Sequence, residues 1–327
     1  MMTQTIFRVS IVVTALCGLL FLAPPVEAAQ STAPAIAAPD QSVVVSPFLN
    51  EVQIAATDTS KDVSINLTNN TAAAQTYTIA VVDFGSLNES GGIAFAGNTD
   101  DKLVRKYGLA NWLRLPRDRV SLKAGESTKI QATVVNETSL GPGGHYAALV
   151  VSIDNADAVG QQTVSVQQKI SALLFATKVG GEVYDLKLTN IQKDGDWRQL
   201  PKIITLDFKN TGNVHVVPRG VVQLIAPGGK TISKGVINEA SAYVLPETTR
   251  QFVVQTEPVS NQGWRPGTYT LRVDYRYDGY DTFASKLIAF RYNNLSGFGF
   301  IIVLLILTIY TGYRLRQRRA RTAAPST

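Results

Sequence analysis

Side chains that could carry out acid–base, nucleophilic or metal chemistry are scarce in this sequence of 327 residues. The two histidines, His145 and His215, are far apart, and neither has cysteine, histidine or carboxylate neighbours at metal-ligand spacing. No Gly-x-Ser-x-Gly motif, which would place a nucleophilic serine on a sharp turn, is present. We therefore predict that the protein is not an enzyme and has no catalytic residue, metal site, cofactor or small-molecule substrate. A hydrolase with an unrecognised site is the alternative.

Two groups of oxygen-bearing side chains leave a loose calcium site open. They are Asp154 with Asp157, and Asn98 with Asp100 and Asp101. Neither group follows the ligand spacing of a known calcium loop, so the prediction remains that no metal is bound.

The segment 85–118 has the composition of a binding loop rather than of a catalytic site. It contains basic and aromatic side chains of the kinds that dominate protein interfaces. We predict ligand binding by Arg105, Lys106, Tyr107, Trp112 and Arg114. The alternative is structural: Trp112 and Leu113 cap the edge of a sheet, and the basic residues are solvated.

The elements that position this segment are predicted to be strands. Short runs in which apolar and polar residues alternate place one face on a core and the other in water. The inward-facing sets are Val63, Ile65 and Leu67; Ile130, Ala132 and Val134; Ile204, Leu206 and Phe208; and Leu271, Val273, Tyr275 and Tyr277. Helical periodicity is rare between the two ends, except for a short helical turn predicted around 101–112.

The central part of the chain contains an internal repeat. The stretch "AGESTKIQATVV…GPGGHYAALV" at 124–150 is similar to "LPETTRQFVVQTE…RPGTYTLRV" at 245–273, and each copy is preceded by an Asn-rich turn. Modules of this length with about seven strands fit an immunoglobulin-like sandwich. We predict an all-β protein of two such sandwiches in tandem, residues 42–180 and 181–294. The first carries 85–118 as an inserted loop, since Asn69 to Glu126 spans 57 residues and Asn210 to Glu247 spans 37.

A tyrosine follows the Pro-Gly turn in both copies. We predict that Tyr146 and Tyr269 bury their rings while each hydroxyl bonds a nearby backbone group, as in a tyrosine corner. Contact of these tyrosines with a ligand is the alternative.

Both ends of the chain have the patterns of export and anchoring. Residues 1–28 have the charge, apolar run and small-residue site of a signal peptide, with a retained N-terminal anchor as the alternative, and 29–41 form a flexible linker. From Leu295 to Tyr313 there is no charged residue, and five arginines follow within 314–327. We predict a transmembrane helix over 295–313 and a basic cytoplasmic tail over 314–327, which makes a single-pass type I protein of the cell membrane with its sandwiches outside.

The basic balance of the chain follows from these ends. There are 31 Lys+Arg and 25 Asp+Glu residues. Without Arg8, Glu27 and the five tail arginines, 25 cations and 24 anions remain, which is a net charge of about +1. This excludes a concentrated phosphate-binding surface, so we predict no nucleic-acid partner. The one cysteine, Cys17, lies in the predicted signal peptide, which favours a bacterial envelope protein without disulfides.

The order of these parts resembles the bacterial WxL-interacting and related two-domain surface proteins. The stretches that carry the resemblance are "VVVSPFLNEVQI", "NWLRLPRDRVSLKAGEST", "GPGGHYAALVV" and "NTGNVHVVPRGVVQLIAPGGKT". The resemblance implies attachment to peptidoglycan through the first domain and to surface partners through the second.

Two functions remain open. The first is a membrane-anchored cell-surface binding, adhesion or scaffold protein that contacts a cell-wall polymer or another surface protein. The alternative is an envelope chaperone or assembly subunit that pairs strand edges, which predicts a free, long edge strand.

Overall fold

The computed structural model describes residues 43–96, 102–153, 169–196, 199–260, 265–293 and 296–322, without the side chains of 102–103, 296–301 and 318–322. These residues belong to one compact unit, Ser42–Thr327. The predicted signal peptide and linker, and the calcium-ligand candidates Asn98, Asp100, Asp101, Asp154 and Asp157, lie outside the described residues.

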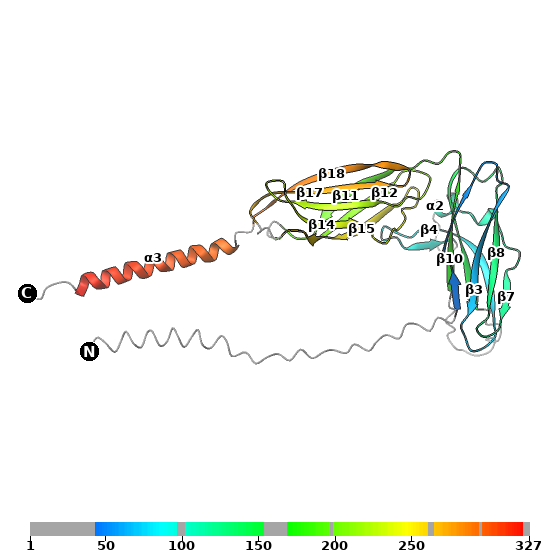
Figure 1. Ribbon diagram of the computed structural model, residues 1–327, viewed down its shortest axis with the longest axis horizontal. Coiled ribbons are helices and arrows are strands. Elements are labelled where there is room, and N and C mark those ends of the chain that lie inside the picture. The colour runs from blue at the N-terminus through cyan, green and yellow to red at the C-terminus, as the bar shows by residue number, and fades with distance from the viewer. Residues whose placement is uncertain are drawn as a thin grey trace, which may run out of the picture. The chain divides into compact units, whose positions relative to one another are not determined.

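The first sandwich is built from ten strands in two sheets (Figure 1). They are β1 (Val43–Ser46), β2 (Leu49–Ile54), β3 (Ser60–Asn69), β4 (Gln75–Ser86), β5 (Ile93–Phe95), β6 (Leu113–Arg114), β7 (Arg119–Leu122), β8 (Ser127–Val135), β9 (Gly143–Ile153) and β10 (Lys169–Lys178). One sheet has the order β1-β3-β8-β6, and the other has the order β2-β10-β9-β4-β5 with β7 also paired to β4. The chain changes sheets between β1 and β2, and β2 then runs parallel to β10.

The second sandwich follows after Lys178 and has a three-stranded and a five-stranded sheet. Its strands are β11 (Leu186–Lys193), β12 (Ile203–Asn210), β13 (Arg219–Ile225), β14 (Thr231–Ile237), β15 (Thr249–Gln255), β16 (Glu257–Pro258), β17 (Gly267–Tyr277) and β18 (Tyr280–Tyr292). The sheet orders are β11-β12-β15 and β16-β14-β13-β17-β18. The described part of the chain is therefore all-β and immunoglobulin-like, apart from short helical turns and one C-terminal helix.

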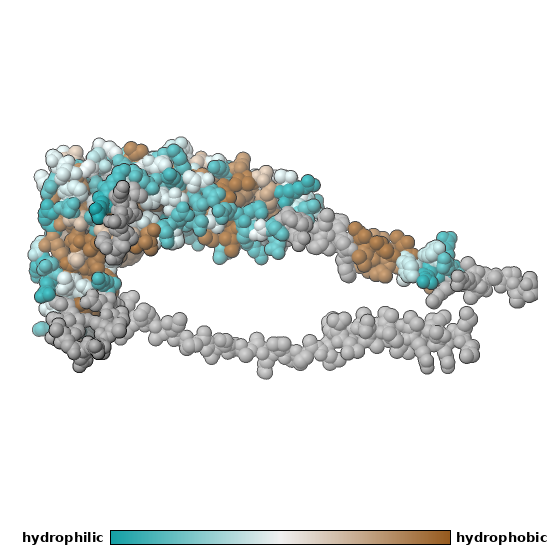
Figure 2. All heavy atoms as spheres, turned by 180° about the vertical axis from the view of Figure 1, so that it is seen from behind, coloured by the Kyte–Doolittle hydropathy of each residue, from teal (hydrophilic) through white to brown (hydrophobic). Residues whose placement is uncertain are grey.

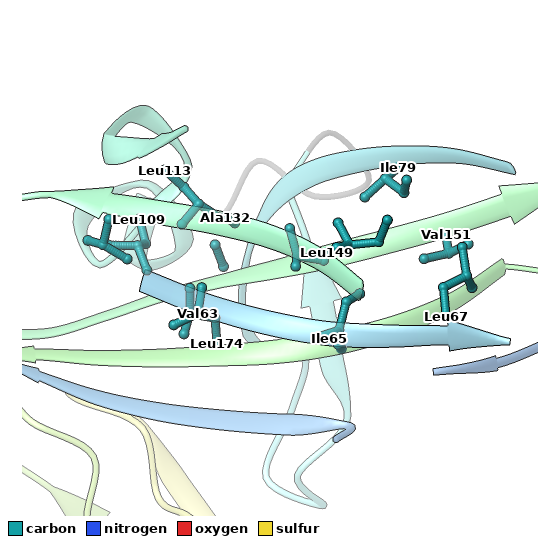
Figure 3. Close-up of a cluster of buried hydrophobic side chains, with 14 of the residues drawn as sticks. Val63, Ile65, Leu67, Ile79, Leu109, Leu113, Ala132, Leu149, Val151 and Leu174 are labelled. Carbon is teal, nitrogen blue, oxygen red and sulfur yellow. The ribbon is translucent and has the colours of Figure 1, made fainter. Parts of the chain in front are cut away.

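The predicted alternation is confirmed in the cores. Val63, Ile65 and Leu67 on β3 are at most 7 % exposed and face inward toward side chains of the opposite sheet such as Leu149 and Leu174 (Figure 3). In the second sandwich Ile204, Leu206, Phe208, Leu271 and Val273 are at most 2 % exposed. At about 25 cal/mol per Å² of apolar surface removed from water, these two faces supply the main driving force for folding.

A buried asparagine closes the same turn in both sandwiches. Asn69 and Asn210 are each fully buried at a strand end. The Asn69 amide donates to the carbonyls of Ala73, Leu122 and Lys123, and its oxygen accepts from Thr71 and from the Tyr77 hydroxyl. The Asn210 amide donates to the carbonyls of Val214 and Val244, and its oxygen accepts from the Gly212 amide. The Asn-rich turns of the repeat are thus fixed by side-chain bonds to backbone groups that a turn leaves unpaired.

The two repeated tyrosines differ. The Tyr269 hydroxyl donates to the carbonyl of Arg265, 2.9 Å away, so the predicted tyrosine corner is confirmed there. The Tyr146 hydroxyl instead accepts from the backbone amide of His215, 3.0 Å away in the second sandwich. The predicted burial of Tyr146 and its bond to a backbone group are confirmed, but the tyrosine corner is not, because that group lies 69 residues along the chain.

The inserted loop of the first sandwich folds into short elements. They include β5, α2 (Lys102–Lys106), the 3₁₀ helix η1 (Ala110–Trp112) and β6. The helical turn predicted around 101–112 is confirmed. Leu113 is buried, and β6 pairs with β8 at the edge of its sheet, as the structural interpretation of this loop requires.

The C-terminal helix α3 (Ser296–Thr322) is 27 residues long. Its apolar side chains from Ile302 to Ile309 form an exposed band that ends at basic residues (Figure 2). Among the described residues, no helix is both long enough and apolar enough to cross a membrane.

Candidate functional site

The inserted loop is anchored to the first sandwich by one carboxylate. Asp83 on β4 accepts hydrogen bonds from the backbone amides of Leu109 and Ala110 through the same oxygen, at 2.7 and 2.6 Å. A Cβ at Gly108 would lie 2.5 Å from this carboxylate, so glycine is required for the close approach. Nothing in the spacing of the sequence marks Asp83, because the contact joins segments more than 20 residues apart.

Two of the predicted ligand-binding residues contact the second sandwich. Lys106 forms an ion pair with Glu247, and the Tyr107 hydroxyl donates to the same carboxylate at 2.9 Å. These bonds from Lys106 and then Tyr107 lower the pKa of Glu247. Glu247 has a φ of 59°, a left-handed conformation that costs a non-glycine residue about 1 kcal/mol or more.

Backbone register shows why this conformation is unusual. The amide of Asn69 bonds the carbonyl of Glu126, and the equivalent amide of Asn210 bonds the carbonyl of Thr248. Glu247 therefore occupies the place of Gly125, whose φ is 71°, and not that of Glu126 as the sequence repeat indicates. The second sandwich thus has a charged residue where the first has glycine, and this residue meets the inserted loop.

Trp112 and Arg114, in contrast, bond residues of the first sandwich. The Trp112 indole donates to the Ser139 hydroxyl at 2.9 Å, and the Arg114 guanidinium donates to Asn111 and pairs with Glu137. Arg105 is exposed and also has an interaction partner. The structure therefore brings Lys106, Tyr107 and Trp112 to one open cavity of about 440 Å³ and leaves Arg105 and Arg114 outside its lining.

A cluster of aromatic rings forms the centre of the junction between the sandwiches. The His215 ring lies 5.7 Å from Tyr146, 4.9 Å from Phe175 and 5.2 Å from Tyr243, in edge-on arrangements. Its Nδ1 is also 3.3 Å from the Tyr146 hydroxyl. Burial lowers the pKa of His215 to about 4, although Glu51 and Asp278 act against this shift. The imidazole is therefore neutral near pH 7.

A polar cavity of about 400 Å³ opens beside this cluster. Glu51 on β2 accepts a hydrogen bond from the Tyr243 hydroxyl and lies 4.0 Å from Nε2 of His215. Burial and the bond to Glu51 raise the pKa of Tyr243 to about 12. Across the cavity, Arg219 pairs with Asp278 at 2.7 Å.

A second candidate surface is the edge strand β18. It is 13 residues long, pairs along its length with β17, and lies at the end of the five-stranded sheet. No other described strand pairs with it. Phe283 and Leu287 are 58 % and 63 % exposed and share one face, since they are four residues apart.

The cavity at the junction is lined by aromatic rings, two carboxylates and one guanidinium. Within the described ranges, no group of three or more His, Cys, Asp or Glu side chains is placed to hold a metal ion. From the sequence, His215 was considered only as a metal ligand, and that role was rejected. Glu51, Tyr243, Arg219 and Asp278 were missed as members of this site. The Asp278-Gly279 turn was the one available signal, because it predicts a hairpin tip that exposes its aromatic neighbours.

The sequence matches no protein-family model and no curated protein. Several solved structures are similar in fold at low identity. A chain of the chaperone-tip adhesin complex of CFA/I fimbriae biogenesis is 12 % identical over 76 % of this chain and 97 % of its own, with a TM-score of 0.40. The E. coli chaperone DraB is 10 % identical over 76 % and 98 %, with a TM-score of 0.36. A PapD-like domain of human CEP192 is 12 % identical over 49 % and 100 %, with a TM-score of 0.32.

The resemblance to the WxL-interacting proteins stays a prediction.

Proposed function

We propose that this protein binds an extended segment of a partner protein along the free edge of β18, as an envelope chaperone or assembly subunit. The observation that carries the proposal is the length and exposure of that edge. An unpaired strand edge presents a row of backbone donors and acceptors, and added strands bind through these groups while side-chain contacts give specificity. Phe283 and Leu287 are exposed on one face of the sheet. Every second side chain of an added strand would lie on that face and could contact them. The solved structures of similar fold include the chaperone DraB and a chaperone-tip adhesin complex.

Lys286 supports a selective rather than a general partner. Lys286 lies between Phe283 and Leu287 along β18 but points to the opposite face of the sheet. Its ammonium donates to the carbonyl of Leu188 at 3.4 Å. A charged side chain that points inward from an edge strand opposes unselective pairing with other sheets. The edge therefore remains free in the absence of a partner whose own strand accommodates this charge.

Photo-crosslinking in cells tests the proposal. A benzophenone amino acid replaces Leu287 on β18 or, as the control, Val236 on β14, which is 52 % exposed and pairs with Val221 of β13 in the same sheet. We expect position 287 alone to crosslink an exported protein, through one extended segment of that protein identified by mass spectrometry. Equal crosslinking at both positions, or none at 287, contradicts the proposal.

A matched substitution tests whether the contact matters. Leu287→Lys places a charge on the exposed face without touching the core, so the fold is kept and crosslinking from position 283 is lost. Val236→Lys changes the charge equally and leaves that crosslinking intact. Retention of the partner by the Leu287→Lys chain would contradict a role for this face.

The surface-binding function has less support at its predicted site. Lys106 and Tyr107 are bonded to Glu247, and Trp112 and Arg114 are bonded to Ser139 and Glu137. Attachment of the loop to a cell-wall polymer would have to compete with these contacts. This attachment is tested by comparing the binding of the unaltered chain and of the Trp112→Ala, Arg114→Ala double variant to isolated cell walls. Equal retention of the two chains contradicts a role for the loop.

We also propose that α3 attaches the protein to a membrane with the sandwiches on the outer side. The sequence has no charged residue from Leu295 to Tyr313. This apolar run therefore begins before Ile302, which is the first residue of the helix whose side chain the structure describes. Leu304, Ile306 and Ile309 are about half exposed or more, which is unfavourable in water, and Arg314 and Arg316 follow. We expect the protein to resist carbonate extraction from membranes. Release by carbonate, or protection of the sandwiches from protease added to whole cells, contradicts this arrangement.

A further inference from the structure

The cavity beside His215 contains a carboxylate for which the described residues record no ion pair with a lysine or arginine. In the described part of the chain, the polar contacts recorded for the Glu51 side chain are with the Tyr243 hydroxyl and with His215. The hydroxyl is uncharged, because its pKa is raised to about 12, and the imidazole is uncharged near pH 7. Glu51, whose side chain is 52 % exposed, therefore has no cationic partner among the described residues near pH 7.

The second carboxylate of the cavity is already paired. Asp278 accepts from the Arg219 guanidinium at 2.7 Å through one oxygen and from the Val217 amide at 2.8 Å through the other. Arg219 also donates to the carbonyl of Val217 at 3.4 Å. The charges of this pair cancel, so the charged side chains that line the cavity sum to −1.

Aromatic rings form the remaining wall. Phe175, Tyr184 and Tyr243 line the cavity together with Glu51. The Tyr243 ring lies 4.9 Å from Phe175, which fixes its position. Ring faces attract cations within about 6 Å of the centroid, and the attraction adds to that of a nearby carboxylate. A volume of about 400 Å³ is ample for the end of one long side chain.

We propose that this cavity binds an organic cation, a primary ammonium or guanidinium group of the kind that ends a lysine or arginine side chain. Glu51 supplies the charge and accepts the cation's hydrogen bonds. The rings of Tyr243 and Tyr184 supply the apolar and cation–π contacts around the alkyl stem. The site is formed by both sandwiches, since Glu51 and Phe175 come from the first and Tyr184 and Tyr243 from the second.

This proposal does not depend on strand pairing at β18. The cavity and the β18 edge share no exposed apolar residue, and the cation site is tested with small probes in the absence of any protein partner. Failure of one proposal therefore leaves the other in place.

Calorimetric titration of the full-length chain tests the cation site. The probes are N-acetyl-arginine amide, N-acetyl-lysine amide and n-butylammonium, with N-acetyl-citrulline amide as a neutral match of the arginine probe. We expect the cations to bind with dissociation constants of about 1 mM and the citrulline probe at least about tenfold more weakly. Tighter binding of the acetylated amides than of n-butylammonium points to a peptide side chain as the ligand, and equal binding to a free amine.

Charge-neutral variants locate the site. Glu51→Gln keeps a group that accepts from Tyr243 and removes only the charge, so we expect about tenfold weaker binding of the arginine probe. Glu89→Gln, an equal change at an exposed position of the first sandwich, leaves binding unaltered. Equal binding of the arginine and citrulline probes, or no effect of Glu51→Gln, overturns the proposal.

Discussion

The tyrosine that follows the Pro-Gly turn forms a different hydrogen bond in each of the two sandwiches. In the second sandwich Tyr269 bonds Arg265, four residues before it, and so fixes its own turn. In the first, Tyr146 follows an equivalent Pro-Gly turn but bonds His215 across the junction. A Cβ at Gly144 would meet the Tyr146 hydroxyl at 2.2 Å, so glycine here allows the ring to reach that position. A repeated motif can therefore keep its packing role while its hydrogen bond is redirected to join the two copies.

The largest expected difference concerns the buried asparagines. Asn69→Ala leaves three carbonyls, the Thr71 amide and the Tyr77 hydroxyl without their partner. We expect it to lower the free energy of unfolding of the first sandwich by about 4 kcal/mol. Asn210→Ala removes fewer recorded bonds and should cost the second sandwich about 2 to 3 kcal/mol. Urea unfolding of both variants measures the difference, and a larger loss from Asn210→Ala would reverse this comparison.

The junction should make stability depend on pH. The pKa of His215 is about 4 in the folded chain against 6.5 as its ordinary value. Between these two values the unfolded chain binds a proton at His215 and the folded chain does not. The free energy of unfolding is therefore highest above about pH 6.5 and falls by about 3 kcal/mol as the pH is lowered to about 4. Glu51 and Asp278 face the ring and reduce this loss.

The His215→Leu variant tests this dependence. Its unfolding free energy should change less between pH 7 and pH 4 than that of the unaltered chain. An identical slope in the two chains would show that His215 is not the titrating group.

The tyrosines provide the direct comparison. Tyr146→Phe leaves the partly buried amide of His215 without its partner and removes the contact with the His215 ring nitrogen, so we expect a loss of about 2 kcal/mol in the free energy of unfolding. Tyr269→Phe removes a bond to a carbonyl near the surface and should cost about 1 kcal/mol. Calorimetry should also show that only Tyr146→Phe separates the unfolding of the two sandwiches. Separate transitions in the Tyr269→Phe chain as well would remove the distinction.

The smallest expected effect is at Glu247. Glu247→Gly restores the residue type of Gly125 and relieves the left-handed backbone, whereas Glu247→Gln removes the same charge without relief. The glycine variant should be more stable than the glutamine variant by about 1 kcal/mol in chemical denaturation. No difference between them would mean that the φ of 59° is not a source of strain.

The sequence alone determined the all-β class, the inward faces of the strands and the repeat. Each of these depends on local alternation or on turn residues such as Asn69 and Asn210, whose partners lie at matching places in both copies. Only the tertiary structure decided where Tyr146, Lys106 and Glu247 act, because their partners lie on the other sandwich, more than 60 residues away along the chain. Spacing encodes which face a side chain takes on its strand. It does not encode which surface of another module will meet that face, since many surfaces can satisfy one hydroxyl or one charge.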